Sequence, residues 1–526
     1  MTDSAGSPRG FLLVAVTDVH GRYISLSTLD MKPHERGLDR VHSYLKKKRA
    51  EGWDTLVIDN GDSIQGTPLV DLFPYGTGGD HPLNLTHRTL GFDAFILGNH
   101  EFNFGFDSLQ EIASKAPVPW LSANMTYAED GSTAYKPYQI FEKGGLKVGL
   151  IGLITAYVPR WEHNSMIPGL AFAEAAETAA KYAQELRPQV DVLIASYHGG
   201  YHKDPETGEL WCHDPLENEG EAILQAAPEL DLLITGHQHR STVFQQENGT
   251  WSAQPGCYAN QFLSVAITPQ PSGNRSVTLR PELIETRGFE PQPELTKALD
   301  PQIARVRRKL DGYLGSADPS FSITDPMREV WLKKHPMIQW VNNLIAEHTG
   351  APIVCTSLLD SALPGLPEEV HLRDIIQNYF FQDNLCLIHV TGEVLMEALE
   401  QVASFFILQT GKSGEPKVTI NAEWRAFRVR SYNYDIFDGI DYGFDLKRPI
   451  GERLAYLRFK GDDVKPRDRL LVGLTTYRAQ GAFYKMFNPE QIVEEFPEKI
   501  TDLMVADLKQ RGHLSVEPVQ NFNVSY

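Results

Sequence analysis

Five short apolar runs in the first half of the chain each end, within a few residues, in Asp, Asn or His beside glycine. The runs span residues 11–16, 56–58, 94–97, 192–195 and 230–234, and a sixth apolar run spans 148–154. Continuous Val, Ile and Leu runs of this length are typical of strands buried on both faces. Loops that leave the carboxyl ends of such strands form the ligand sites of α/β folds. The polar residues are therefore expected to converge on one site.

The polar residues at these positions are metal ligands by type. They are Asp18, His20, Asp62, Asn99, His198, His237 and His239. Asp18 and His20 are two residues apart, so on an extended strand end they project the same way. Nitrogen and oxygen ligands without sulfur suit Mn, Zn, Fe or Co. Two such ions can clamp a phosphoryl group and activate water, so we expect a site with two divalent metal ions.

The chain is long enough for two domains. It has 526 residues, and single hydrophobic cores stop growing near 250–300 residues. Helical patterns lie at 38–48 and 171–186, and apolar residues recur every three or four positions from Leu295 to Leu310, which indicates an amphipathic helix. Later helices are expected at 331–348 and 395–408, and strands at 432–437 and 470–477. We predict a catalytic domain at 1–288, a linker helix at 289–318 and a smaller substrate-binding domain at 319–526.

Charge and cysteine content exclude several classes of function. Lys and Arg number 49 against 68 Asp and Glu, a net charge of −19, which argues against binding a nucleic-acid polymer. The four cysteines are widely spaced, so neither a disulfide framework nor a thiolate zinc site is expected.

No segment of the sequence is long and apolar enough to predict a membrane span: the first apolar run has six residues, and no later run approaches the ~20 needed to span a bilayer. We expect a cytoplasmic protein that does not bind membranes, although removal of a signal peptide would leave the same sequence. The oligomeric state is left open.

The ordered motifs carry a family resemblance. Asp18-x-His20, Gly61-Asp62, Gly98-Asn99-His100-Glu101, His198 and Gly236-His237-x-His239 resemble the calcineurin-like metallophosphoesterases. The longer context resembles the bacterial 5′-nucleotidase / 2′,3′-cyclic-nucleotide 2′-phosphodiesterase family. The resemblance implies an α/β fold: an N-terminal β-sandwich flanked by helices (αββα), a linker helix and a smaller α+β domain of the 5′-nucleotidase type.

The resemblance also implies roles for the site residues. One metal takes Asp18, His20, Asp62 and His239, and the other takes Asp62, Asn99, His198 and His237. His100 matches the family's catalytic histidine, which stabilises phosphorane charge or protonates the leaving alkoxide. Plain 5′-nucleotidases carry Asp three residues after this histidine, whereas this chain has Asn103, as in the cyclic-nucleotide branch.

Two segments of the second domain resemble base-stacking loops. They place Phe381 and Tyr477 at the aromatic positions, and every base offers a π-face for such stacking. The loop that carries a substrate-gripping arginine in 5′-nucleotidases corresponds to residues 356–365, which contain Asp360 and no arginine.

These features predict a dinuclear-metal phosphoester hydrolase that acts on nucleotides. A 2′,3′-cyclic-nucleotide 2′-phosphodiesterase/3′-nucleotidase is favoured. A 5′-nucleotidase or a nucleotide-sugar hydrolase is one alternative, and a non-nucleotide phosphoester substrate is another. From a different class, a non-catalytic binding protein on a phosphoesterase scaffold would lack some metal ligands, whereas this sequence retains all seven.

Overall fold

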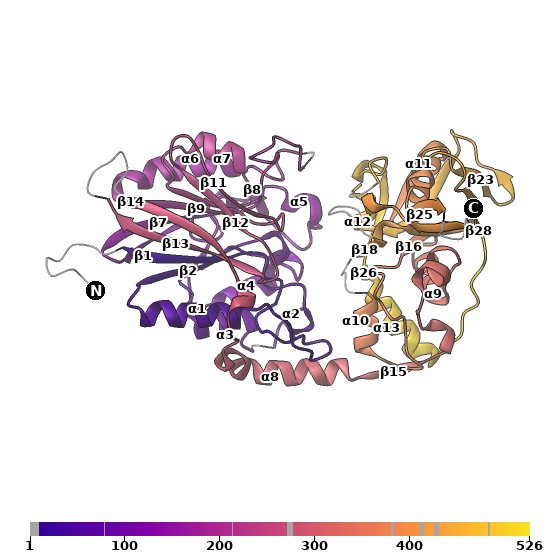
Figure 1. The fold of residues 1–526 in the computed structure, drawn as a ribbon, viewed down its shortest axis with the longest axis horizontal. Coiled ribbons are helices and arrows are strands. Elements are labelled where there is room, and N and C mark those ends of the chain that lie inside the picture. Colours follow the sequence, from indigo (N-terminus) through magenta and orange to yellow (C-terminus); the bar gives the residue numbers. More distant parts are fainter. Residues whose placement is uncertain are drawn as a thin grey trace. The chain divides into compact units, whose positions relative to one another are not determined.

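The computed structural model describes residues 10–77, 79–212, 214–270, 277–379, 383–410, 415–424, 431–481 and 484–526. The chain divides into two compact units, residues 1–307 and 308–526 (Figure 1). Among the described residues, no helix has the length and apolar character needed to cross a membrane. The chain has the expected two-domain α/β fold.

Two six-stranded mixed sheets form the first unit. The first sheet has the order β14 (Val277–Glu285), β13 (Gln261–Pro269), β1 (Phe11–Val16), β2 (Thr55–Asp59), β3 (Ala94–Ile96), β4 (Trp120–Leu121). The second has the order β11 (Ser241–Gln245), β12 (Trp251–Pro255), β10 (Leu232–Ile234), β9 (Val192–His198), β7 (Leu146–Ile154), β6 (Tyr138–Lys143). A small pair, β5 (Met125–Tyr127) and β8 (Leu170–Phe172), lies apart from both.

The central strands of each sheet run parallel. β1, β2, β3 and β4 pair in parallel order, and so do β7, β9, β10 and β12. Polar residues at the carboxyl ends of these strands therefore meet at one edge of each sheet. The six apolar runs expected to form strands overlap β1, β2, β3, β7, β9 and β10. The bounds of β1 agree residue for residue, whereas the runs at 94–97 and 230–234 extend one and two residues beyond β3 and β10.

The sheets pack face to face around alternate residues of their strands. Leu13 and Ala15 of β1 share a core with Val148 and Leu150 of β7. The intervening residues Ile151 and Leu153 turn outward and pack with α6 (Ala175–Leu186) and α7 (Gly220–Ala226). α1 (Leu38–Ala50), α3 (Pro82–Leu90) and α4 (Phe106–Ser114) lie on the side of the first sheet (Figure 1). The unit is thus an αββα sandwich, as expected.

The predicted amphipathic helix is α8 (Pro293–Leu310). Its apolar residues Leu295, Leu299, Ile303 and Val306 are buried, and the division between the two units falls inside it. The domain limits given above, 1–288 and 319–526, remain predictions.

The second unit is α+β. Its central sheet has the order β21 (Asp435–Asp438), β16 (Ile353–Ser357), β25 (Arg469–Thr475), β18 (Asn384–Thr391), β26 (Ile492–Lys499). Smaller sheets combine β17 (Glu369–His371), β15 (Tyr313–Ala317) and β27 (His513–Leu514), and β24 (Asp462–Asp463), β23 (Leu454–Phe459), β22 (Ile440–Asp445) and β28 (Phe522–Ser525). β19 (Phe406–Thr410) pairs with β20 (Pro416–Ile420). The helices are α9 (Pro336–Thr349), α10 (Leu372–Asn378), α11 (Gly392–Ala403), α12 (Thr476–Ala479) and α13 (Ile500–Arg511).

Two helix predictions in this unit were too long. The helix expected at 395–408 ends at Ala403, and Phe406 begins the strand β19. The helix expected at 331–348 begins at Pro336, because proline lacks the N–H that an interior position needs and is favoured in the first turn. The strands expected at 432–437 and 470–477 are β21 and β25, each shifted or shortened by a few residues.

Candidate metal centre

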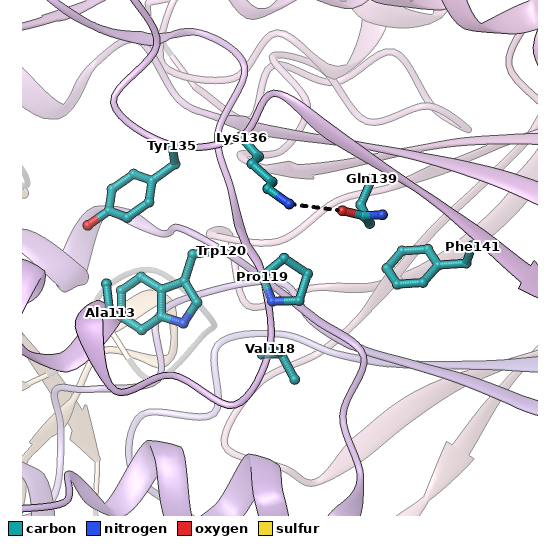
Figure 2. Close-up of a pocket in the computed structure, with 8 residues that line it drawn as sticks. All are labelled: Ala113, Val118, Pro119, Trp120, Tyr135, Lys136, Gln139 and Phe141. Atoms are coloured by element: carbon teal, nitrogen blue, oxygen red, sulfur yellow. Dashed lines mark hydrogen bonds between the residues drawn. The ribbon is translucent and has the colours of Figure 1, made fainter.

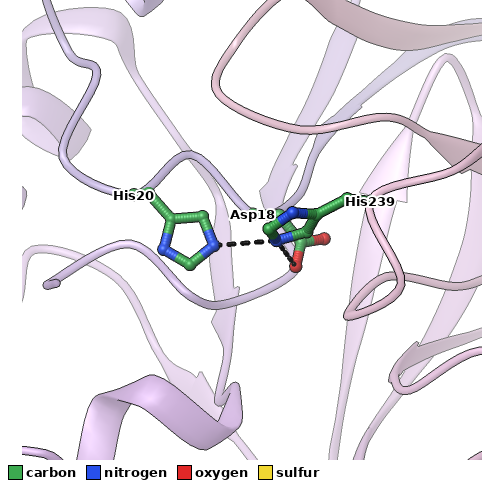
Figure 3. A group of neighbouring side chains, drawn as sticks. All are labelled: Asp18, His20 and His239. Carbon is green, nitrogen blue, oxygen red and sulfur yellow. Dashed lines mark hydrogen bonds and ion pairs between the residues drawn. The ribbon is translucent and has the colours of Figure 1, made fainter. Parts of the chain in front are cut away.

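The seven predicted ligands lie together at one end of the sandwich. Each sits on or just beyond a parallel strand: Asp18 and His20 after β1, Asp62 after β2, Asn99 after β3, His198 at the end of β9, and His237 and His239 after β10. Six of them form two groups whose ligand atoms lie within 4.8 Å of one another. The first group is Asp18, His20 and His239 (Figure 3), and the second is Asp62, His198 and His237.

In the first group the polar atoms face one another. Nε2 of His20 lies 3.0 Å from Nε2 of His239, which in turn lies 3.5 Å from Oδ1 of Asp18. Burial lowers the pKa of His20 to about 3, and burial also lowers the pKa of His239. Both imidazoles are therefore neutral near pH 7, the form that binds a metal.

In the second group Nε2 of His198 lies 3.1 Å from Oδ2 of Asp62, in a geometry that makes no hydrogen bond. Asn99 joins this group, because its Oδ1 lies 2.8 Å from Nδ1 of His237. Oδ2 of Asp62 also lies 4.0 Å from Nε2 of His20 in the first group. Asp62 is therefore placed between the two groups.

The backbone at these ligands adopts an unusual conformation. Nine described residues other than glycine have positive φ, and five of them are predicted ligands: Asp18 (50°), His20 (48°), Asp62 (55°), His237 (67°) and His239 (57°). Such conformations cost about 1–3 kcal/mol each and persist where the surroundings impose them, commonly at functional sites.

Two glycines allow the loops after β2 and β3 to pack closely. A Cβ on Gly61 would lie 2.4 Å from the backbone nitrogen of Gly98, and a Cβ on Gly98 would lie 2.3 Å from Oδ1 of Asp62. Gly61 also has a φ of 86°, which favours glycine. The glycines beside Asp62 and Asn99 are thus required for these residues to approach each other.

Several further residues hold the ligands in place, and all but Glu101 carry no signal in the sequence. Nδ1 of His198 donates to the carbonyl of Asn60 at 2.5 Å, Nδ1 of His20 lies 3.3 Å from Oε1 of Gln65, and Nε2 of His237 lies 3.3 Å from Oε1 of Glu217. Glu101, from the Gly98–Glu101 motif, accepts hydrogen bonds from the backbone nitrogens of Gly98, Asp62 and Ser63. Such outer contacts orient ligands and tune their affinity.

The electrostatics of the second group favour positive charge. Burial would lower the pKa of His198, but the carboxylates of Asp62 and Asp18 outweigh it and raise that pKa to about 10. Burial would raise the pKa of Asp62, but His198 and His100 hold it well below its usual value. A place that retains a proton so strongly also attracts a metal cation.

His100 lies beside the ligands and is held by two hydrogen bonds. Its backbone N–H donates to Oδ1 of Asp62 at 2.8 Å, and its Nδ1 lies 2.7 Å from Oδ1 of Asn103. Burial acts to lower the pKa of His100, but Asp62 and the hydrogen bond with Asn103 outweigh it, so the pKa is raised. Protonated His100 can donate a proton or stabilise negative charge.

The two residues predicted for base stacking lie in the second unit. Tyr477 is the second residue of α12 and is 36% exposed, and its ring lies 6.3 Å from that of Tyr432. The neighbouring Arg478 is buried and pairs with Asp435, Nε to Oδ2 at 2.8 Å, which fixes the turn. Phe381 lies outside the described residues.

Comparison with known proteins identifies both units. The family model for calcineurin-like phosphoesterases matches residues 11–241, and that for the 5′-nucleotidase C-terminal domain matches residues 315–488. The chain therefore combines a calcineurin-like phosphoesterase domain with a 5′-nucleotidase C-terminal domain.

Some relatives of this phosphoesterase match nearly the whole chain, and others match only part of it. The "2′,3′-cyclic-nucleotide 2′-phosphodiesterase/3′-nucleotidase" of Haemophilus influenzae is 27% identical over 97% of this chain and 86% of its own length. Protein UshA of Escherichia coli is 30% identical over 40% of this chain and 36% of its own. A solved Staphylococcus aureus structure, described as a 5′-nucleotidase in complex with alpha-ketoglutarate, is 28% identical to this chain and superposes with a TM-score of 0.83. The match covers 98% of this chain and 100% of the Staphylococcus aureus chain. The chain is a phosphoester hydrolase.

Calcineurin-like phosphoesterases use a dinuclear divalent metal site, and the donor set of this phosphoesterase fits one. The seven side chains offer carboxylate, amide oxygen and imidazole donors without sulfur, which suit transition metals. His198 presents a buried Nε2 that makes no hydrogen bond, and its other nitrogen is fixed by Asn60. Asp62 lies where its carboxylate is shared by both groups.

A separate cavity of this phosphoesterase contains none of these residues. It has a volume of about 580 Å³ and is lined by Ala113, Val118, Pro119, Trp120, Tyr135, Lys136, Gln139 and Phe141. Nζ of Lys136 donates to Oε1 of Gln139 in its wall at 3.4 Å (Figure 2). The cavity adjoins the edge strands β4 and β6 rather than the strand ends that carry the ligands.

Proposed function

We propose that this phosphoesterase is a 2′,3′-cyclic-nucleotide 2′-phosphodiesterase/3′-nucleotidase with two divalent cations. Three relatives with this name are 27%, 24% and 26% identical over 97%, 98% and 94% of the chain. The observation that carries the choice among nucleotides is Asn103 opposite His100, where plain 5′-nucleotidases have Asp. The reaction cleaves the P–O2′ bond with water, and a second hydrolysis then releases phosphate from the 3′-nucleotide.

The proposed ligand sets follow the two groups of donor atoms. Asp18, His20, Asp62 and His239 hold one cation, and Asp62, Asn99, His198 and His237 hold the other, with Asp62 shared. Bound cations supply Lewis-acid stabilisation of the phosphoryl group and favour ionisation of water. We propose Mn, Zn, Fe or Co, since the donors are nitrogen and oxygen.

His100 is proposed to act on the leaving ribose oxygen. With Nδ1 hydrogen-bonded to Asn103, Nε2 is the nitrogen that can give a proton to the alkoxide when its bond to phosphorus breaks. The raised pKa of His100, to which Asp62 and Asn103 contribute against the effect of burial, keeps more of the protonated form at neutral pH.

Tyr477 is proposed to bind the base together with Phe381, which lies outside the described residues. The partly exposed Tyr477 ring offers a stacking surface on a turn fixed by Arg478. The loop of residues 356–365 does not support a 5′-monophosphate, because its Asp360 is an exposed carboxylate and would repel an anionic group. A 5′-nucleotidase is the second candidate, since the second unit matches that domain. The cytoplasmic location stays a prediction.

Substrate assays separate these candidates. Protein loaded with Mn²⁺ is tested on 2′,3′-cyclic AMP, 3′-AMP and 5′-AMP, with bis(p-nitrophenyl) phosphate as a generic phosphodiester. The proposal predicts the highest kcat/KM on 2′,3′-cyclic AMP and then 3′-AMP. A preference for 5′-AMP would favour the second candidate. Turnover of the generic ester with none of the three nucleotides would refute a nucleotide substrate.

A further inference from the structure

Beyond the ligands, a carboxylate from a distant loop contacts the partner of the catalytic histidine. Glu162 directly follows the short helix α5 (Val158–Trp161), 59 residues after Asn103. Nδ2 of Asn103 donates to Oε1 of Glu162 at 2.5 Å, and Oδ1 of Asn103 lies 2.7 Å from Nδ1 of His100. The three side chains form one continuous chain of hydrogen bonds.

We propose that Glu162 is a positioning residue that fixes the orientation of the Asn103 amide, so that its oxygen faces His100. This inference rests on the proposed role of His100. An ionised carboxylate only accepts hydrogen bonds, whereas an amide both donates and accepts. The NH₂ group of Asn103 must therefore face Glu162, and its oxygen must face the imidazole.

The orientation of the amide decides which imidazole nitrogen carries the proton. The amide oxygen can only accept, so Nδ1 of His100 is the donor and Nε2 is left for the substrate. If the amide turned over, its NH₂ group would face Nδ1 and would oppose a proton there. Glu162 prevents this reversal, because its carboxylate has no hydrogen to offer the amide oxygen.

Neighbouring contacts hold Glu162 in place. Its backbone N–H donates to the carbonyl of Val158 at 3.0 Å. The ring of the preceding residue, Trp161, lies 5.1 Å from the ring of His237. A few residues later, the carbonyl of Met166 accepts from the backbone N–H of Phe106 at 2.9 Å. This segment therefore contacts the metal centre and the loop of Asn103 at several points, as a positioning element requires.

Asn103 and Glu162 are complementary as a pair. An aspartate at position 103 would place a second carboxylate against Glu162, and two like charges at hydrogen-bond distance repel. The asparagine therefore keeps a hydrogen-bond acceptor on His100 and offers a donor to Glu162. If the two residues act as a pair, removal of the Glu162 side chain lowers kcat when residue 103 is asparagine and raises kcat when residue 103 is aspartate. A merely structural role of Glu162 does not predict this reversal.

The test is a double-mutant cycle on the full chain loaded with Mn²⁺. E162A, E162Q, N103D and N103D/E162A are assayed with 2′,3′-cyclic AMP and bis(p-nitrophenyl) phosphate, and kcat and KM are separated. Removal of the exposed carboxylate of Glu129, in E129A, is the matched control. Metal content and Tm are measured for each variant, so that loss of the site or of folding is distinguished from loss of positioning.

We expect E162A to lower kcat about tenfold with KM and metal content unchanged. E162Q can accept from Asn103 but can also donate to its oxygen, so its kcat is expected to lie between those of the wild type and E162A. In the N103D background, E162A raises kcat, because it removes the opposing carboxylate. The proposal is overturned if E162A lowers kcat by the same factor in both backgrounds, or if E162A matches E129A. The generic ester keeps this outcome separate from failure of the nucleotide assignment.

Discussion

Oδ2 of Asp62 lies 3.1 Å from Nε2 of His198, and both atoms are buried. The same oxygen lies 4.0 Å from Nε2 of His20. One carboxylate therefore connects the loops that follow β1 and β2 with the end of β9, from both sheets of the sandwich. This arrangement makes Asp62 the residue on which the whole proposed centre depends.

Substitution of Asp62 tests this dependence. D62N removes the shared negative charge but keeps the shape of the side chain. We expect kcat on bis(p-nitrophenyl) phosphate to fall at least about 10³-fold, because metal ions contribute several kcal/mol to transition-state stabilisation. The bound metal, measured by elemental analysis, falls with it. D441N, at an exposed carboxylate of the second unit, is the control and keeps both values. Unchanged metal content in D62N would contradict the shared role.

His100 acts in the chemical step rather than in metal binding. H100A is expected to lower kcat by about 10²–10⁴ with two metals retained. Because the acid form is the active one and the pKa is raised by Asp62 and Asn103 against burial, kcat falls as pH rises through that raised pKa. N103A removes one of the raising contacts, so this alkaline limb moves to lower pH. A limb that stays in place in N103A would show that another group titrates.

Tyr477 is expected to recognise the base. Stacking on an aromatic ring is worth about 1–3 kcal/mol per base, so Y477A should raise KM for 2′,3′-cyclic AMP by about 5–150-fold. KM for bis(p-nitrophenyl) phosphate, which has no base, should change much less. Tyr456 on β23 is 37% exposed against 36% for Tyr477, so Y456A is a matched control. An equal rise in KM for both substrates in Y477A would refute base stacking.

A buried histidine away from the site makes stability depend on pH. Burial, then the positive fields of His87 and Arg305, lowers the pKa of His81 from 6.5 to about 3. Below pH 6.5 the unfolded chain binds a proton at His81, whereas the folded chain does not. The free energy of unfolding therefore falls as pH drops from 6.5 towards 3.

The H81N variant isolates this contribution. Asparagine keeps an acceptor for the N–H of Leu83, which His81 caps at the start of α3, but it does not titrate. The loss of Tm between pH 7 and pH 5 is expected to be smaller in H81N than in the wild type. An H513N variant, at an exposed histidine, serves as the control. An equal loss of Tm in H81N and wild type would contradict the assignment.

The sequence predicted the site better than the second unit. Apolar runs such as 11–16 gave strand positions, and the Asp, Asn and His residues beyond them have no other reason to recur beside glycine. The helix expected at 395–408 was wrong beyond Ala403, because apolar residues at 405–408 fit a strand as well as a helix. The pairing of β19 with β20 makes this segment a strand. That pairing is a contact between separate segments, so the apolar pattern of one segment does not reveal it.

The residues that support the ligands could not be predicted. Glu162 and Glu217 reach Asn103 and His237 from loops 59 and 20 residues away, and neither lies in a motif or at a periodic position. Asn60 acts through its backbone carbonyl, which every residue type carries. The positive φ of Asp18 and Asp62 likewise follows from the packing of the loops and cannot be predicted from the residue types.

The number of metal ions bound per chain tests whether the proposed dinuclear centre exists. The full chain is reconstituted with excess Mn²⁺, freed of unbound metal and analysed for metal and protein by elemental analysis, and its hydrolysis of bis(p-nitrophenyl) phosphate is followed before and after chelation. We expect two ions per chain, and we expect activity to be lost with the chelator and restored by Mn²⁺. Fewer than one ion per chain, with hydrolysis unaffected by the chelator, would contradict it.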